Sequence, residues 1–264
     1  MATRDARFCQ TCGSALTAAH EQEAVGGASW TLADIGKAIG IVILGTIVAS
    51  VPPAIVADLI AGSGAIEDDP TALTIALGAS IFLEVFLLGT ALHFSVRKYR
   101  LSVGSLGLRW PQSGGFWATV GLAFGLVVGG LGISFVYFAA LDAVGISPDT
   151  DLPEQAYQSA GPLIVLGVLS LAIAPLMEET FFRGFVFGGL RNRWGVVAAA
   201  GASGLLFAAA HLGNPGTIYL IPPVALIGAL FAWGYLASGS LLASMAAHFL
   251  FNLVAFTAGV VEYS

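Results

Sequence analysis

Charged residues, cysteines and basic clusters are scarce in this sequence. Charged side chains make up 10% of its 264 residues, whereas an ordinary soluble domain has about 25%, so a water-soluble globular domain is excluded. No run of Lys and Arg could hold phosphates, and we expect no nucleic-acid partner. The cysteines are Cys9 and Cys12 alone, which are too few by themselves for a four-ligand zinc site.

Hydrophobic sequence fills most of the chain. Hydrophobic residues make up 57% of it, the mean hydropathy is +0.87, and the apolar runs are continuous rather than alternating, which favours helices over a β-barrel. Since about 20 apolar residues span a bilayer, the sequence predicts an all-α, polytopic integral membrane bundle of about seven (7–8) transmembrane helices. The predicted spans are 35–60, 71–96, 116–141, 162–190, 196–212, 218–237 and 241–261.

Two parts of the chain differ in composition. Residues 1–30 form a polar head that ends in a Gly-containing linker, and residues 31–264 form the membrane domain. The loops between the apolar runs alternate between basic and acidic. By the positive-inside rule the N-terminus, the 97–109 loop and Arg191 lie in the cytoplasm, which predicts a multi-pass protein of the cell membrane. The Pro52–Pro53 pair should kink or break the first span.

The head contains the segment 8–13 (FCQTCG), which resembles one knuckle of a zinc ribbon. Its two-residue spacing lets the thiolates of Cys9 and Cys12 bind one metal ion. His20 could be a third ligand, or a second copy of the chain could complete the site and make a homo-oligomer through the head. A degenerate knuckle that binds nothing is the alternative. A disulfide is disfavoured on the cytosolic side.

Three charged residues, Glu178, Glu179 and Arg183, stand at the end of a long apolar run. Each costs about 2.5 to 3.5 kcal/mol near the middle of a membrane span, so such residues usually face a protein interior or a water-filled cavity. Later apolar runs supply three further polar residues, which are His211, His248 and Asn252. At 1.5 Å of rise per residue, Glu178 and His211 lie roughly 20 and 22 Å from the cytoplasmic ends of their helices, and His248 roughly 10 Å.

Spacing within the helices suggests how these side chains divide their roles. Glu179 and Arg183 are four residues apart and share a helix face, whereas Glu178 and Glu179 point about 100° apart. One carboxylate can therefore pair with the arginine while the other faces a cavity. Two histidines, a carboxylate and an amide in a low-dielectric site provide a base for water, an orienting or metal-ligating group, and oxyanion donors, which amide-bond hydrolysis requires.

Purely structural interpretations are open for each residue. A single intramembrane histidine is more often a helix-packing residue than a catalyst, and Glu179 with Arg183 could be a buried structural pair. Glu84, midway along the second span, is expected to partner Arg183 or to line the same cavity. His93, near the cytoplasmic end of that span, is interpreted as structural.

The combined pattern resembles a known family. Three motifs, E178-E179-x-x-x-R183, F207-x-x-x-H211 and H248-x-x-x-N252, are similar in order, spacing and helical context to those of the CPBP intramembrane proteases. That family includes the type II CAAX prenyl endopeptidases and the bacteriocin-immunity-like Abi proteins. The resemblance covers residues 35–261, with a motif core at 175–252, and segment 106–109 (LGLR) resembles the family's cytoplasmic lead-in.

The resemblance implies a role for each matching residue. Glu178 would activate the attacking water with help from His211, and His248 and Asn252 would form the oxyanion site. Glu179 and Arg183 would brace the motif helix. A metal-dependent mechanism is the alternative, with Zn²⁺ bound by Glu178, His211 and His248.

The implied activity is an intramembrane endopeptidase acting on membrane-anchored peptides or proteins, prenylated CAAX-like ones among them. We expect the motif helices to line a cavity that opens toward the cytoplasmic leaflet. A non-catalytic immunity or scaffold protein is one alternative function. A transporter is a weaker one, because the sequence shows no inverted repeat.

Overall fold

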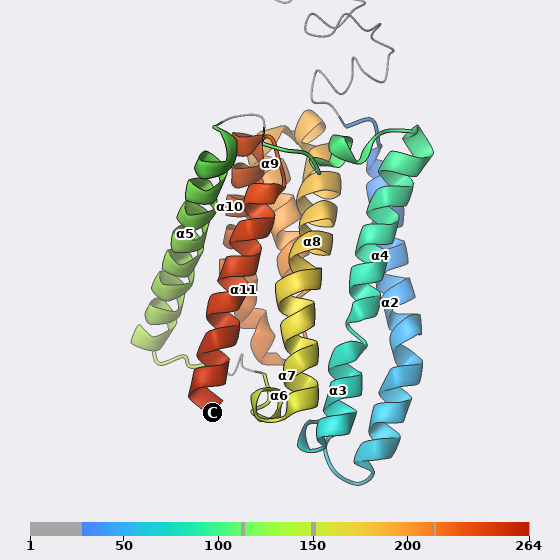
Figure 1. Ribbon diagram of the computed structural model, residues 1–264, viewed down its shortest axis with the longest axis vertical. Helices are drawn as coiled ribbons and strands as arrows, with labels where there is room; N and C mark the ends of the chain where they lie inside the picture. The colour runs from blue at the N-terminus through green and yellow to red at the C-terminus, as the bar shows by residue number, and fades with distance from the viewer. Residues whose placement is uncertain (1–27, 112–113, 149–151, 214, 264) are drawn as a thin grey trace, which may run out of the picture.

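The computed structural model describes residues 28–111, 114–148, 152–213 and 215–263, and the regular structure in these residues is helical (Figure 1). The α-helices are α2 (Leu32–Ala61), α3 (Pro70–Gly78), α4 (Ile81–Leu92), α5 (Gly115–Ala143), α6 (Gln155–Gln158), α7 (Ala160–Gly167), α8 (Ala174–Glu178), α9 (Gly188–Ala209), α10 (Ile221–Ser238) and α11 (Leu242–Tyr263). Three π-helical segments, His93–Arg97, Val168–Ile173 and Glu179–Phe187, extend α4, α7 and α8. Short 3₁₀ helices lie at Ile66–Asp68, Val103–Leu106 and Pro215–Leu220.

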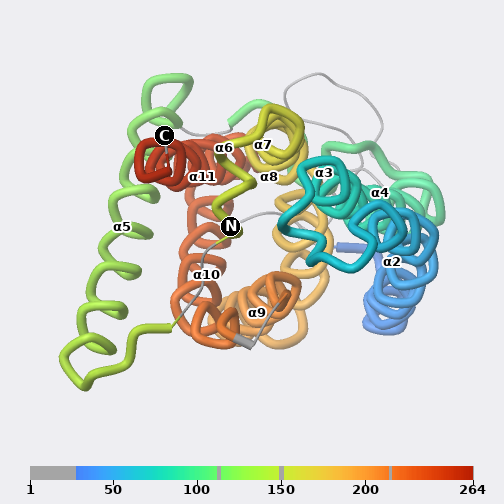
Figure 2. Tube along the Cα trace, turned by 90° about the horizontal axis from the view of Figure 1, so that it is seen from below, coloured from blue at the N-terminus to red at the C-terminus, as the bar shows by residue number. Residues whose placement is uncertain are grey.

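Within the described residues, six helical stretches are long and apolar enough to cross a membrane. They are Leu32–Ala61, Pro70–Arg97, Gly115–Ala143, Ala160–Ala209, Gly216–Ser238 and Leu242–Tyr263. Seen along the bundle, α5 lies at one edge and α2 to α4 at the other, with the remaining helices between them (Figure 2). The chain is therefore a multi-pass helical membrane protein.

The six candidate spans differ from the seven predicted ones at a single place. Ala160–Ala209 is 50 residues long, which at 1.5 Å per residue is about 75 Å and far exceeds a hydrocarbon core of about 30 Å. Gly195 interrupts it with φ 76° and ψ 170°, and the Ser203 hydroxyl donates to the Phe182 carbonyl at 2.7 Å. The stretch is therefore a hairpin with two limbs, 160–194 and 196–209, which correspond to the predicted spans 162–190 and 196–212.

The Pro52–Pro53 pair, predicted to kink or break the first span, does not break it. Both prolines lie inside α2, which is assigned as one helix from Leu32 to Ala61. A proline removes one backbone donor and crowds the preceding turn, but a long membrane helix tolerates this loss because neighbouring helices and local adjustments satisfy the freed groups.

The start of α2 is tied to the loop that follows α4. Thr31 caps the helix in a reciprocal capping box with Asp34. The buried Asp34 carboxylate also accepts from Lys98 Nζ at 2.5 Å and from the Tyr99 hydroxyl at 2.6 Å. The hydrogen bond to Asp34 raises the pKa of the Lys98 ammonium. These bonds fix the relative positions of two segments 64 residues apart in the chain.

The two ends of the bundle carry opposite charges. Successive spans alternate in direction (Figure 1), which gathers the described Lys and Arg residues, Arg183 excepted, at the end where α2 begins; these are Lys37, Arg97, Lys98, Arg100, Arg109, Arg191 and Arg193. We call this the basic end. The opposite, acidic end has no described Lys or Arg and carries Asp58, Glu67, Asp68, Asp69, Asp142, Glu154 and Glu262. The positive-inside rule predicts that the basic end is cytoplasmic.

Close packing of α9 against α10 gives a first testable prediction. A Cβ added at Gly204 would lie 2.3 Å from the Ala225 carbonyl oxygen, whereas one at Gly201 on the same helix would meet nothing within 4 Å. We expect Gly204→Ala to destabilise the protein by about 1 to 3 kcal/mol because the two backbones must separate. Gly201→Ala is the matched control and should leave stability unchanged. Thermal unfolding in detergent measures both, and equal melting temperatures would contradict the close α9–α10 contact.

Candidate active site

The two adjacent glutamates lie where α8 passes into the π-helical segment Glu179–Phe187. Every residue from Glu178 to Leu190 is buried, and Phe181, Phe182, Phe185 and Phe187 belong to the main hydrophobic core. The aromatic side chains and the wide π-helical turns fill the centre of the bundle. The charged side chains at this position are therefore held in a low-dielectric interior.

Glu179 and Arg183 form the predicted buried ion pair. Arg183 Nη1 lies 3.0 Å from Glu179 Oε1, and both side chains are fully buried. The guanidinium also stacks over the Phe207 ring, with Cζ 4.2 Å from its centroid. Among the described residues the guanidinium nitrogens have no other carboxylate partner, so the charge of Arg183 depends on Glu179 and on the aromatic face.

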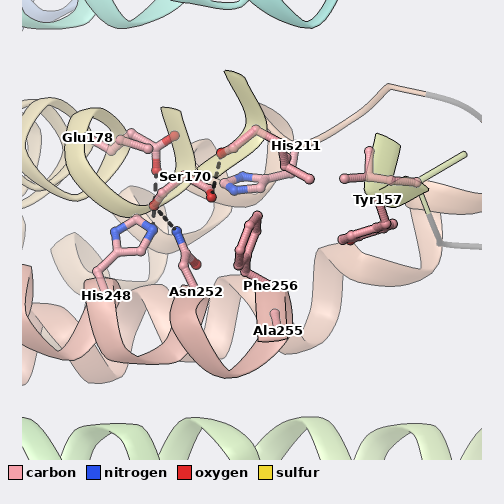
Figure 3. Close-up of a pocket in the computed structure, with 11 residues that line it drawn as sticks. Tyr157, Ser170, Glu178, His211, His248, Asn252, Ala255 and Phe256 are labelled. Carbon is pink, nitrogen blue, oxygen red and sulfur yellow. Dashed lines mark hydrogen bonds and ion pairs between the residues drawn. The ribbon is translucent and has the colours of Figure 1, made fainter. Parts of the chain in front are cut away.

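His248 of α11 lies between the two glutamates. Its Nδ1 is 3.1 Å from Glu179 Oε1. On the other side of the ring, its Nε2 is 3.8 Å from Oε2 of Glu178, and Figure 3 shows these two side chains. Because Glu179 is already paired with Arg183, its carboxylate acts as the acceptor and the proton of the imidazole lies on Nδ1. This tautomer leaves the Nε2 lone pair directed at Glu178.

Glu178 and His248 are at the inner end of a pocket of about 270 Å³. His211 and Asn252, the other two predicted site residues, line the same pocket (Figure 3). The Asn252 amide donates to the Ser170 carbonyl at 2.8 Å. Oε2 of the buried Glu178 carboxylate has no hydrogen-bond partner in the described part of the chain. The pocket lining thus brings together a carboxylate with an unpartnered oxygen, two imidazoles and an amide.

His211 was predicted to lie inside a helix, and the structure places it just after the helix end. α9 ends at Ala209, and His211 is exposed in the turn that follows. Its Nδ1 lies 2.9 Å from the Phe207 carbonyl oxygen, which can only accept, so Nδ1 carries the proton and Nε2 keeps its lone pair.

Glu84 has a different partner from the expected Arg183. This buried side chain of α4 interacts with the carboxyl group of Glu178, and it is not among the residues that line the pocket.

The predicted zinc ligands do not form a complete set. Glu178 and His248 face each other, but among the described residues no group of three or more His, Cys, Asp or Glu side chains is arranged to hold a metal ion. His211 shares the pocket without completing a three-ligand set in this conformation. Cys9, Cys12 and the homo-oligomer predicted through the head lie outside the described residues.

Sequence reasoning did not identify Ser170 and Tyr157, which also line the pocket. Ser170 contributes a backbone carbonyl, which any residue type could provide, so the sequence carries no signal for it. Tyr157 lies in α6, a single helical turn within the loop between two predicted spans. The only feature of the sequence that could have pointed to Tyr157 is its position as an aromatic residue directly after the acidic stretch of this loop.

The fold and the site together define a class: a multi-pass helical membrane protein with a buried carboxylate–imidazole cluster at the inner end of a pocket. Residues 160–254 match the family model described as type II CAAX prenyl endopeptidase Rce1-like. The matched segment contains every predicted catalytic residue from Glu178 to Asn252. No curated protein and no solved structure matches the chain.

Proposed function

We propose that this protein is an intramembrane endopeptidase that hydrolyses peptide bonds of membrane-anchored substrates. The observation that carries the proposal is the placement of Glu178 and His248, which face each other across 3.8 Å at the inner end of the pocket. The match of residues 160–254 to the type II CAAX prenyl endopeptidase Rce1-like model supports the same reaction class.

The separation of the two groups fits one water molecule. A distance of 3.8 Å between Glu178 Oε2 and His248 Nε2 is too long for a direct hydrogen bond. A water about 2.8 Å from each atom would bridge them. With the Glu178 carboxylate ionised and the His248 proton on Nδ1, both partners are acceptors. They would take the two protons of the water and direct a lone pair of its oxygen into the pocket.

The hydrolytic step then needs no covalent intermediate. The water oxygen attacks the carbonyl carbon of the scissile bond while one water proton passes to the Glu178 carboxylate. The resulting tetrahedral oxyanion collapses, the C–N bond breaks, and Glu178 returns the proton to the leaving nitrogen. The products are a carboxylic acid, which keeps the second water proton until it ionises, and an amine, and both glutamates end in their starting state.

The remaining site residues bind the substrate or orient the catalytic groups. Asn252 uses one N–H on the Ser170 carbonyl and has a second N–H for the oxyanion. Glu179 fixes the tautomer of His248 and is a positioning residue. His211 has a free lone pair on Nε2, with which it can accept a hydrogen bond from the backbone N–H of a bound substrate.

Cleavage of a library of membrane-anchored peptides by the purified protein tests the proposal. We expect the wild type to cleave, and His248→Ala to be slower by about 10²-fold or more. His93→Ala is the matched control, because His93 lies in the π-helical segment after α4 and outside the pocket. Equal rates for wild type and His248→Ala would overturn the assignment.

Adding a chelator to the same cleavage assay tests whether the reaction requires zinc. Hydrolysis by Glu178 and His248 alone predicts an unchanged rate after exhaustive chelation. Loss of cleavage on chelation with recovery on added Zn²⁺ would instead assign a metal-dependent mechanism to the pocket.

A further inference from the structure

A second cavity lies among the membrane-spanning helices, separate from the catalytic pocket. Its volume is about 320 Å³, and its walls come from α2, α4, the π-helical segment Glu179–Phe187 and the end of α9. α2 and α4 belong to one edge of the bundle (Figure 2). The second cavity and the catalytic pocket share no lining residue.

The outer rim of the second cavity faces the hydrocarbon region of the bilayer. Ile43 and Ile47 of α2 line the cavity and are 54% and 59% exposed. Their span begins at Leu32, so at 1.5 Å per residue they lie roughly 16 and 22 Å from its start, near the middle of this long helix. The medium at the rim therefore consists of lipid chains and not of water.

The inner wall of the second cavity belongs to the core that holds the catalytic segment. Leu87, Phe181 and Phe182 line the cavity and are between 1% and 3% exposed. The Phe182 ring meets the Phe207 ring edge-on, with 5.3 Å between centroids, and the Arg183 guanidinium stacks over Phe207. Whatever fills the cavity therefore packs against the segment that contains the buried ion pair.

The size and lining of the second cavity select the kind of occupant. Thr46 has the one polar side chain among the described lining residues, and a single hydroxyl cannot hold an ordered water, which needs about two to four polar partners. The cavity follows α2 from Ile39 to Ile47, about 12 Å. A helix of that length and about 10 Å across would occupy roughly 900 Å³, far more than the cavity. A flexible alkyl chain fits both the volume and the apolar lining.

We propose that the second cavity is a binding site for one acyl chain of a bilayer lipid, and that the chain stabilises the segment that carries the catalytic glutamates by packing on Phe181 and Phe182. An unfilled cavity would forfeit dispersion contacts around its whole lining, and a chain that enters from the surrounding bilayer restores them. The inference is independent of the proposed function, because it concerns a separate cavity and is tested without cleavage.

A photoactivatable lipid tests the site. The purified protein is reconstituted in phosphatidylcholine that carries a diazirine on one acyl chain, irradiated, and mapped by mass spectrometry. We expect labels on Phe181 and Phe182, which a chain contacts only from inside the cavity. Ile43→Trp should lose these labels because the larger side chain occupies the cavity. Ile55→Trp is the matched control and should keep them, because Ile55 is 55% exposed on the same helix and does not line the cavity.

Two further variants decide the route and the chemistry of the occupant. Leu206→Trp blocks the cavity from the opposite wall and should also lose the labels on Phe181 and Phe182, so the test stands even if Ile43→Trp does not fold. Thr46→Val removes the lining hydroxyl and keeps the shape of the side chain, and it should keep the labels because an acyl chain needs no polar partner.

Three results would overturn the inference. Labels confined to the rim would show that another part of the chain or a second copy fills the cavity. Labels on Phe181 and Phe182 that persist in both blocked variants would show another route to these residues. Loss of the labels in Thr46→Val would assign the cavity to a polar ligand.

Thermal unfolding tests whether the chain stabilises the fold. Adding phosphatidylcholine to delipidated protein in detergent should raise the melting temperature of the wild type and of Ile55→Trp by about 2 to 4 °C. Ile43→Trp should show no such rise, because its cavity is already filled. An equal rise in all three proteins would show that lipid acts on the outer surface and not through the second cavity.

Discussion

Glu178→Gln is expected to lower the cleavage rate by about 10³-fold while the fold is retained. The amide has the shape of the carboxylate, so the packing against α4 and α11 is preserved, but it cannot accept a proton from the attacking water. The side chain is 6% exposed, and no bulk water can replace it as a base at that position. The measurement is the initial rate of cleavage of the peptide that the wild type prefers.

Two comparisons make this result specific. Glu67→Gln removes a carboxylate from the 3₁₀ helix Ile66–Asp68 at the acidic end, far along the chain from the pocket, and should leave the rate unchanged. The melting temperature of Glu178→Gln should equal that of the wild type or exceed it, because a buried charge has been removed. A Glu178→Gln protein that cleaves at the wild-type rate would contradict the role of Glu178 as the base.

Glu179→Leu should reduce stability by about 3 to 5 kcal/mol, a larger loss than we expect for Gly204→Ala. It leaves the Arg183 guanidinium, which is fully buried, without a carboxylate. It also removes the partner that holds Nδ1 of His248 at 3.1 Å. Thermal or SDS-induced unfolding in detergent measures the loss, and cleavage should fall with it because His248 is no longer held in one tautomer.

The double variant Glu179→Leu, Arg183→Leu separates the cost of an unpaired charge from the value of the pair. Since buried ion pairs can often be replaced by apolar residues with little loss, we expect the double variant to recover most of the stability but not the activity. A Glu179→Leu protein as stable as the wild type would show that Arg183 has another source of compensation in the fold.

The division of roles between the two glutamates could be predicted from the sequence. Adjacent helical residues point in different directions and residues four apart share a face, so Glu179 pairs with Arg183 while Glu178 faces the pocket. That reasoning is local and depends on helix geometry alone. The same four-residue spacing predicted that His248 and Asn252 share one helix face, and both line the pocket in the structure.

The partners that depend on tertiary packing could not be predicted. Glu84 was expected to partner Arg183 or to line the same cavity, and it instead interacts with Glu178 outside the pocket lining, because the rotation of α4 about its axis is set by packing and not by its own sequence. His248 contacts both glutamates for the same reason. Spacing within α11 fixes which residues share its face but not which nitrogen of the ring meets which carboxylate.

The walls of the pocket were also beyond the sequence. Depth counting compared Glu178, His211 and His248 along their own helices, but it could not bring Tyr157 of α6 or the Ser170 carbonyl to the same cavity. These contacts join segments far apart in the chain. Gly195 is a partial exception, since a glycine between two apolar runs is a signal for a turn, and the hairpin turns there.

Hydrolysis in ¹⁸O-labelled water, followed by mass spectrometry of the products, is the most direct test of a water-activating Glu178–His248 pair. The purified wild type should give products in which each new carboxyl terminus contains one oxygen from the solvent, and Glu178→Gln should give no such product above background. Identical labelled products from both proteins, or new termini without solvent oxygen, would contradict activation of water by Glu178.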